Sequence, residues 1–353
     1  MGQVHRARAC ASVAAMRRPR GGESERPPPG RVEIHEGDNL PLLAALPDAS
    51  FDLIYVDPPF NTGRDQERRR LRTERGDDGD RVGFQGRRYR TTVLGSARYA
   101  DHFDDYLEFL VPRLREAHRL LAPTGSFFLH LDYREVHYVK VALDGIFGRD
   151  AFINEIIWAY DYGARSRRRW SAKHDNILWY ARDPRRYHFD HDAIDRIPYM
   201  APGLVGPVKA ARGKTPTDTW WHTIVSPTGK EKTGYPTQKP LGILERIVRV
   251  HSRPGARLLD FFAGSGSFGE AAAALGRDVV LIDANPEAIA VMERRLARFA
   301  PQVLRPAPIV EPTAAPVEEP AGGAHEAVSI LPPSPTGLGP SPLHTPGNRA
   351  KDA

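Results

Sequence analysis

Residues 51–61 read Phe-Asp-Leu-Ile-Tyr-Val-Asp-Pro-Pro-Phe-Asn, and the interpretation of the whole chain starts from this stretch. The apolar run 51–56 is typical of a buried strand. Pro58 and Pro59 then fix φ and lack an N–H, so the chain can neither continue in a sheet nor begin a helix there. The result is a stiff turn that carries the Asp57 carboxylate, free carbonyls and the ring of Phe60. Such a turn can bind an amino group and stack a flat ring, which suits a nucleobase amine. Asp and Pro are also common in ordinary turns, so this stretch alone leaves both interpretations open.

The composition is that of a globular protein with a mild basic excess. The 353 residues are enough for one large α/β domain or two smaller ones, and the formal charge of +6 weakly favours a polyanionic partner. The single cysteine, Cys10, excludes intrachain disulfides and a cysteine-based metal site. It lies in residues 1–30, which are rich in Arg, Pro and Gly and are predicted to be a disordered basic leader. No apolar stretch approaches the ~18 residues of a membrane span, so we expect a cytoplasmic protein without a membrane anchor.

The residues that flank the Asp57 turn predict a βαβ unit. A short alternating strand begins at Arg31, and leucines at helical spacing follow Asp38 and Asn39, either of which can cap that helix. From 61 to 100 the apolar pattern is lost, and an arginine run and several glycines predict a flexible loop. That loop either closes over a substrate and contacts phosphates or is a solvated surface insertion.

The rest of the chain alternates between helical and strand patterns. We expect helices at 104–121, 138–147, 241–251, 268–275 and 286–299, and strands at 126–131, 152–160, 174–180, 257–262 and 278–282. Residues from 182 to about 219 are irregular. Residues 300–353 are proline-rich and without periodicity, and are predicted to be a disordered tail.

A second motif follows the predicted strand at 257–262 and reads Asp260-Phe261-Phe262-Ala263-Gly264-Ser265-Gly266. Glycines directly after a buried strand let the backbone turn tightly and approach a ligand. Asp283 ends the next strand, roughly 20 residues on, where an acid in nucleoside-binding α/β folds accepts hydrogen bonds from a ribose. The glycine spacing also fits a dehydrogenase. A dehydrogenase does not need the Asp57 turn, however, and most of the predicted sheet precedes the glycines, so this alternative is set aside.

The chain resembles the β class of S-adenosylmethionine-dependent DNA amino-methyltransferases in the order of two motifs, Asp57-Pro58-Pro59-Phe60 and, far downstream, Asp260–Gly266. Three further parts of the sequence are similar to the family pattern: Gly37-Asp38-Asn39, Thr237-Gln238-Lys239-Pro240 and Asp283. The resemblance covers about residues 31–299 and implies one methyltransferase catalytic domain. The implied fold is α/β and Rossmann-like, with a mostly parallel seven-stranded sheet, helices on both faces and a permuted motif order. Residues 182–234 would then be the target-recognition region.

The resemblance implies direct methyl transfer from S-adenosylmethionine to N6 of a flipped-out adenine. Asp57 and the Pro58 carbonyl would bind the amine, Pro59 completes the motif, and Phe60 would stack on the base. The cofactor would lie against a larger set of residues: Asp260, Phe262, Ala263, Gly264, Ser265 and Gly266 around the methionine and ribose, Asp283 on the ribose hydroxyls, Asp38 at the adenine amine, and Lys239 at the methionine carboxylate. Helix capping is the alternative role for Asp38, and simple exposure is the alternative for Lys239.

The expected partner is double-stranded DNA. Asn61 and the arginine cluster Arg165, Arg167, Arg168 and Arg169 are candidate contacts to the DNA strand, where phosphate contacts position without specifying sequence. The resemblance also raises a homodimer and a cognate restriction endonuclease as partners. No metal is expected, since the sulfonium donor is already activated. Cytosine-N4 methylation and a non-catalytic DNA-binding protein of the same fold remain the alternatives. An Asp in the first motif position goes mainly with adenine in this family, which favours N6.

Overall fold

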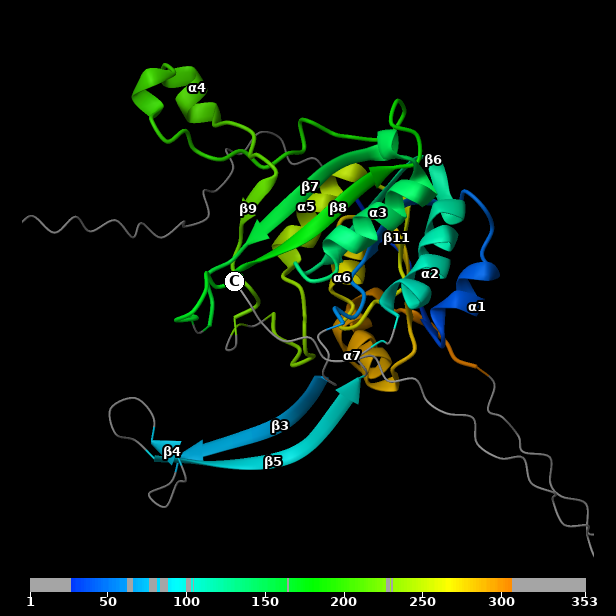
Figure 1. The fold of residues 1–353 in the computed structure, drawn as a ribbon, viewed down its shortest axis with the longest axis vertical. Coiled ribbons are helices and arrows are strands. Elements are labelled where there is room, and N and C mark those ends of the chain that lie inside the picture. Colours follow the sequence, from blue (N-terminus) through cyan, green and yellow to red (C-terminus); the bar gives the residue numbers. More distant parts are fainter. Residues whose placement is uncertain are drawn as a thin grey trace, which may run out of the picture. The chain divides into compact units, whose positions relative to one another are not determined.

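The computed structural model describes residues 27–61, 66–75, 81–82, 88–99, 103, 105–163, 165–226, 229 and 231–306, with 66–75, 81–82 and 88–99 described as backbone only. Within these ranges nine strands form one sheet in the order β12-β1-β11-β10-β2-β6-β8-β7-β9 (Figure 1). Their bounds, in that order, are Gln302–Leu304, Val32–Glu36, Asp278–Asp283, Arg257–Asp260, Phe51–Val56, Leu121–Leu131, His174–Ala181, Phe152–Ala159 and Thr219–Trp221. Every neighbouring pair is parallel except the two that include β8.

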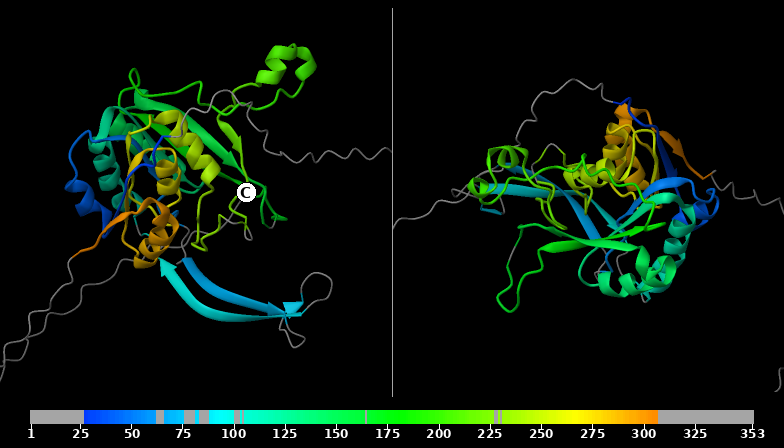
Figure 2. Two further views of the ribbon diagram at one scale, coloured as in Figure 1. Left: turned by 180° about the vertical axis from the view of Figure 1, so that it is seen from behind. Right: turned by 90° about the horizontal axis from the view of Figure 1, so that it is seen from above.

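Helices cover both faces of this sheet because its central strands are apolar on both sides. In β2, Ile54 and Val56 belong to one buried cluster, and Leu53 and Tyr55 belong to the other. The first cluster includes residues of α1 (Asn39–Ala44), α2 (Tyr106–Leu120) and α3 (Val136–Phe147). The second includes residues of α5 (Leu241–His251), α6 (Ser267–Ala274) and α7 (Pro286–Leu296). Figure 2 (right) shows α5–α7 in yellow and orange on one side of the sheet and α2 and α3 in blue-green on the other.

The two predicted motifs lie on neighbouring strands. β2 and β10 are parallel, with Leu53 opposite Leu258 and Ile54 opposite Leu259. Parallel strands end at the same edge of a sheet, so the Asp57 turn after β2 and the glycine loop after β10 emerge side by side. This confirms the predicted arrangement of the two motifs and the predicted α/β fold, a mostly parallel sheet with helices on both faces.

The expected count of seven strands is wrong, because short strands extend the sheet at both edges. β12 pairs with β1, with Glu33 opposite Gln302, and β9 pairs with β7, with Trp158 opposite Trp220. β12 lies inside the segment 300–353 that was predicted to be disordered, so that boundary is too early. Three residues are too few to show a periodic pattern. At the other end of the domain, the Gly30 N–H donates to the Ala273 carbonyl at 3.0 Å, so order begins before residue 31. Residues 1–26 and 307–353 lie outside the described residues.

The segment 61–100 is also more regular than the predicted flexible loop. Its described backbone forms a separate antiparallel sheet in the order β3-β5-β4, built from Gln66–Arg75, Arg88–Tyr99 and Arg81–Val82. The β3–β5 ladder runs from Gln66 opposite Tyr99 to Arg75 opposite Tyr89. The arginine-rich sequence gave no strand signal because a ladder between backbone groups does not require alternating apolar residues. The remaining positions of this segment up to residue 102 lie outside the described residues.

The region 182–234, predicted to recognise the target, contains little regular structure besides β9. It includes a short 3₁₀ turn, η3 (Pro202–Leu204), and one short helix, α4 (Pro207–Arg212). Two further 3₁₀ turns, η2 (Arg149–Ala151) and η4 (Ala297–Phe299), lie elsewhere in the domain. No helix in the described ranges is long and apolar enough to cross a membrane. The same ranges contain no group of three or more His, Cys, Asp or Glu side chains that could hold a metal ion.

Candidate active site

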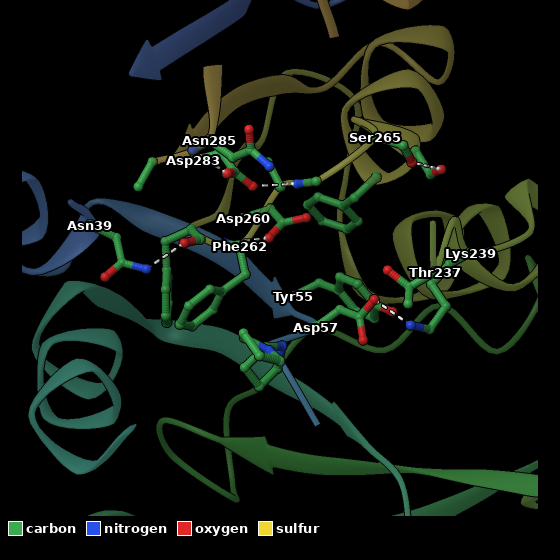
Figure 3. Close-up of a pocket in the computed structure, with 18 of the residues that line it drawn as sticks. Asn39, Tyr55, Asp57, Thr237, Lys239, Asp260, Phe262, Ser265, Asp283 and Asn285 are labelled. Atoms are coloured by element: carbon green, nitrogen blue, oxygen red, sulfur yellow. Dashed lines mark hydrogen bonds and ion pairs between the residues drawn. The ribbon is translucent and has the colours of Figure 1, made fainter. Parts of the chain in front are cut away.

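A cavity of about 490 Å³ opens where β2, β10 and β11 end (Figure 3). Most of the residues predicted for the site line this cavity: Asp38, Asp57, Pro58, Pro59, Phe60, Lys239, Asp260, Phe262, Ala263, Gly264, Ser265 and Asp283. Gly266 is the one predicted cofactor residue that does not line it. Its φ is +71°, and a Cβ at this position would lie 2.8 Å from Met292 Cγ, so Gly266 instead lets α6 begin close against α7.

Asp283 fastens the glycine loop to the end of β11. Its Oδ2 accepts a hydrogen bond from the Gly264 N–H at 2.8 Å, and its Oδ1 accepts one from the Asn285 N–H at 2.9 Å. Burial raises the pKa of the Asp283 carboxyl, and these two backbone hydrogen bonds act against that rise. Gly264 has a φ of +49°, which brings the loop backbone to the cavity wall. The loop and its acid are therefore held in place before any ligand arrives.

Asp260 is the most deeply buried acid of the site, at 3% exposure. Its Oδ1 accepts a hydrogen bond from the Phe262 N–H at 3.0 Å, which shapes the start of the glycine loop. Burial raises the pKa of this carboxyl well above its usual range, and the charges of Asp57 and Asp283 add to the rise. Asp38 caps α1, which was the alternative role expected for it: its Oδ1 accepts a hydrogen bond from the Leu40 N–H at 3.2 Å. It also lines the cavity, so both expected roles remain compatible with its position.

The Asp57 turn is braced by side chains from other elements. Asn61, with a φ of +51°, donates from Nδ2 to Glu135 Oε1 at 2.8 Å and accepts from the Phe103 N–H at 3.1 Å. The Tyr106 hydroxyl donates to the Pro59 carbonyl at 2.7 Å. The NH2 group and the oxygen of the Asn61 amide thus both bind protein groups. This arrangement does not favour the predicted contact of Asn61 with DNA.

Lys239 and Asp57 form an ion pair across the cavity, through Lys239 Nζ and Asp57 Oδ2 (Figure 3). The ammonium also lies 4.8 Å from the centroid of the Phe60 ring. Asp57 Oδ1, by contrast, is buried and has no hydrogen-bond partner among the described residues. Lys239 was expected at the methionine carboxylate of the cofactor, and its pair with Asp57 is an additional contact that the sequence did not predict. Sequence reasoning could not find this pair, since the two residues are 182 positions apart.

A second cavity, of about 670 Å³, adjoins the first. Four residues line both cavities: Phe60, Tyr235, Thr237 and Lys239. The far wall of the second cavity includes Trp158, Tyr160 and Arg169. Of the predicted arginine cluster, only Arg169 lines either of these cavities in the described part of the chain, and Arg165 pairs with Asp161. Arg167 and Arg168 are exposed on the same loop between β7 and β8.

A buried polar chain, which the sequence analysis missed, connects the walls of the two cavities. The Tyr55 hydroxyl lies 2.8 Å from His130 Nδ1, and His130 Nε2 lies 3.2 Å from Asp175 Oδ2. The Tyr160 hydroxyl donates to Asp175 Oδ1 at 3.1 Å. Burial alone would raise the pKa of Asp175, but the hydrogen bond and charge of His130 outweigh it, and the pKa is lowered. The available signal was His130, a polar residue between two leucines of β6.

Several other lining residues also escaped prediction. They are Asn39, Tyr55, Phe109, Arg113, Tyr235 and Asn285 in the first cavity. Asn285 caps α7 by accepting from the Glu287 N–H at 2.9 Å, and the Asn-Pro pair at the start of that helix was its only sequence signal. The first cavity has the size of a small-molecule site, with aromatic walls, a close-approaching glycine loop and fixed carboxylates. These features fit a nucleoside-containing ligand.

The comparison with known families agrees with this geometry. The DNA methylase family of the N6/N4 type matches residues 51–294, which is more than half of the chain. The chain belongs to this family. Its members are S-adenosylmethionine-dependent DNA amino-methyltransferases, so the cofactor is S-adenosylmethionine and DNA is the substrate.

Curated relatives give the same assignment, and a solved structure shares the fold. The type II methyltransferase M.HpaI of Haemophilus parainfluenzae is 30% identical over 257 residues, covering 73% of this chain and 71% of that protein. The DNA adenine methyltransferase YhdJ of Escherichia coli K12 is 29% identical over 276 residues, covering 74% and 82%. The structure of the cytosine-N4-specific PvuII DNA methyltransferase has a TM-score of 0.51 at 14% identity, covering 79% and 98%. That level of identity supports the shared fold alone.

Proposed function

We propose that this DNA methylase transfers the methyl group to N6 of adenine, on a base flipped out of double-stranded DNA. The observation that carries the proposal is the buried Oδ1 of Asp57, which has no hydrogen-bond partner in the described part of the chain and lies beside the junction of the two cavities. One cavity suits the cofactor, and the other, lined by Phe60, Trp158 and Tyr160, suits a flat base. Asp57 would thus bind an amino group that lies between them.

In the proposed mechanism the protein makes a poor nucleophile reactive by holding it in place. An exocyclic amine shares its lone pair with the ring. Asp57 Oδ1 and the Pro58 carbonyl accept hydrogen bonds from its two hydrogens, which turns the nitrogen toward tetrahedral geometry and directs its lone pair into the first cavity. S-adenosylmethionine supplies the methyl group, and the sulfonium sulfur keeps the electron pair of the broken carbon–sulfur bond. Asp57 Oδ1 is the acceptor for the proton that the methylated nitrogen releases.

The target base must leave the duplex to reach this position, at a cost of about a few kcal/mol. The Phe60 ring lies on the wall shared by the two cavities, where it can stack on the flipped base. Basic side chains line the second cavity and would contact the flanking phosphates: Arg169, Lys173 and Lys232.

The choice of adenine rests on two supports. The first is the Asp in the first position of the motif, which in this family goes mainly with adenine. The second is the similarity to YhdJ, whose name specifies adenine, at 29% identity. Cytosine-N4 is the second candidate, because the same turn can hold either exocyclic amine. The type II methyltransferases among the relatives also support a cognate restriction endonuclease as a partner, and a homodimer stays a prediction.

The decisive experiment incubates the protein with tritiated S-adenosylmethionine and unmethylated double-stranded DNA, followed by nucleoside analysis. We expect label in N6-methyladenine, and its loss by at least about 10²-fold in Asp57→Asn. The amide oxygen of this variant would accept from Lys239 Nζ, as Asp57 Oδ2 does, so that the amide NH2, a donor, would replace the acceptor that faces the amine. The matched control is Asp144→Asn, which removes a carboxylate paired with Lys140 on α3, outside both cavities. This control should methylate like the wild type. Label in N4-methylcytosine would contradict the choice of base, and full activity of Asp57→Asn would contradict the mechanism.

A further inference from the structure

We propose that Lys239 is a positioning residue for methyl transfer, acting through Asp57 and not through the cofactor. By holding Asp57 Oδ2, the ammonium fixes the carboxylate so that Oδ1 remains directed at the incoming amine. The inference rests on the proposed function, because it assigns a role to a residue beside the carboxylate that binds the amine.

The two oxygens of the Asp57 carboxylate have different surroundings. Of its two oxygens, Oδ2 is occupied by Lys239 Nζ, and Oδ1 is buried without a partner among the described residues. A carboxylate without a fixed partner could rotate and present either oxygen. The ion pair removes that freedom, and the 4.8 Å contact of the ammonium with the Phe60 ring ties the base-stacking side chain to the same point.

The segment that carries Lys239 is itself anchored. Gln238 Oε1 accepts from the Thr233 N–H at 2.9 Å and from the Thr233 hydroxyl at 2.8 Å, and Gln238 Nε2 donates to the Glu231 carbonyl at 2.8 Å. Glu231 Oε1 accepts from the Leu241 N–H, at the first residue of α5, at 2.7 Å. Lys239 therefore extends from a fixed turn just before α5 and is only 7% exposed. Such a side chain is preorganised for one contact.

The positive charge of Lys239 also acts on two neighbouring acids. Burial is the largest influence on the pKa of Asp260 and Asp175 and acts to raise both. The positive charge of Lys239 acts in the opposite direction at both carboxyls. Lys239 thus pairs with the Asp57 carboxylate and also acts on the acids of Asp175 and Asp260.

The test separates a role of Lys239 in positioning Asp57 from a role in binding the cofactor, because it measures catalysis and cofactor binding independently. In Lys239→Gln and Lys239→Ala, we expect the single-turnover rate at saturating S-adenosylmethionine to fall about 10²-fold, the scale of losing one positioning contact. The dissociation constant of the cofactor should change by less than about threefold, which is under 1 kcal/mol. Added ethylammonium should restore part of the rate of Lys239→Ala, because it can occupy the vacated position beside Asp57.

The matched control is Lys140→Met. Lys140 pairs with Asp144 at 2.7 Å and lies 4.1 Å from the Phe152 ring, so it has the same kind of contacts at a place outside both cavities. It should retain the wild-type rate. Should Lys239→Ala not fold, Lys239→Gln alone carries the comparison, since its length preserves the packing of the side chain.

The outcomes distinguish this inference from the proposed function. A wild-type protein that methylates no DNA overturns both. A wild-type protein that is active while Lys239→Gln keeps its rate overturns the positioning role alone. A variant that loses cofactor affinity more than about tenfold, with an unchanged rate at saturation, assigns Lys239 to the cofactor and also overturns the inference.

Discussion

At the scale of single residues, the buried acids of the first cavity should leave a signature in the pH dependence of stability. The pKa of Asp260 is raised in the folded protein, above all by burial. Between the unfolded value, about 3.9, and the raised folded value, the folded state holds a proton that the unfolded state has lost. The free energy of unfolding contributed by Asp260 therefore falls as the pH rises through this window.

Asp260→Asn removes that titration while keeping an oxygen that can accept from the Phe262 N–H. We expect the stability of the variant relative to the wild type to increase from pH 4 upward, by about 1.4 kcal/mol for each unit by which the pKa is raised. Thermal unfolding without cofactor at a series of pH values measures it. Asp144→Asn is the control with the opposite sign, because hydrogen bonds from Lys140 and Tyr180 outweigh burial and lower the pKa of Asp144. The stability of Asp144→Asn should fall below that of the wild type as the pH rises. A stability difference between Asp260→Asn and the wild type that does not change with pH would contradict the predicted effect of Asp260.

The identity of single site residues was largely predictable, and their pairing was not. Asp57, Asp260 and Asp283 were found because each directly follows or ends an apolar strand, which is where ligands bind in this type of sheet. The Lys239–Asp57 pair was missed because side chains far apart in sequence meet only after the strands are assembled. Asn61 was assigned to DNA for the same reason, since its partners Glu135 and Phe103 could not be foreseen.

At the scale of elements, the start of α6 depends on Gly266. This residue has a φ of +71°, and an added Cβ would lie 2.8 Å from Met292 Cγ on α7. Gly266→Ala should therefore lower the free energy of unfolding by about 1–3 kcal/mol through backbone strain and overpacking. Gly145→Ala in α3 is the control, since nothing lies within 4 Å of its added Cβ and alanine favours the helix. Chemical denaturation of both variants decides, and equal stability of the two would contradict the prediction.

Long elements were predicted well, and short or highly charged ones were not. The helix expected at 241–251 is α5 (Leu241–His251), and the strand expected at 174–180 is β8 (His174–Ala181), because each shows a sustained apolar pattern. β9 and β12 have three residues each and take their place from the neighbouring strand alone. The arginine-rich ladder of β3 and β5 shows that backbone pairing can form where the side-chain pattern gives no signal.

At the scale of the whole molecule, the parallel sheet unites motifs that are far apart in the chain. The order β11-β10-β2-β6 brings the ends of four strands to one edge, where the two cavities share Phe60, Tyr235, Thr237 and Lys239. The permuted motif order therefore has no consequence for the geometry of the site, since only the spatial order of the strands determines which residues meet. Apart from those four shared residues, different side chains line the two cavities. A substitution in the second cavity alone should therefore weaken DNA binding without affecting cofactor binding.

Arg169 offers the test of that separation, because it is exposed and lines the second cavity only. If it contacts a phosphate, Arg169→Ala should weaken DNA binding uniformly across sequences and reduce the slope of log affinity against log salt by about 1. Binding of S-adenosylmethionine should not change. Arg31→Ala is the control, since Arg31 is also exposed but pairs with Asp278 at the start of β11, at the opposite edge of the sheet. DNA titrations at several salt concentrations measure both. An unchanged slope in Arg169→Ala, or an equal loss in Arg31→Ala, would show that DNA does not follow the second cavity.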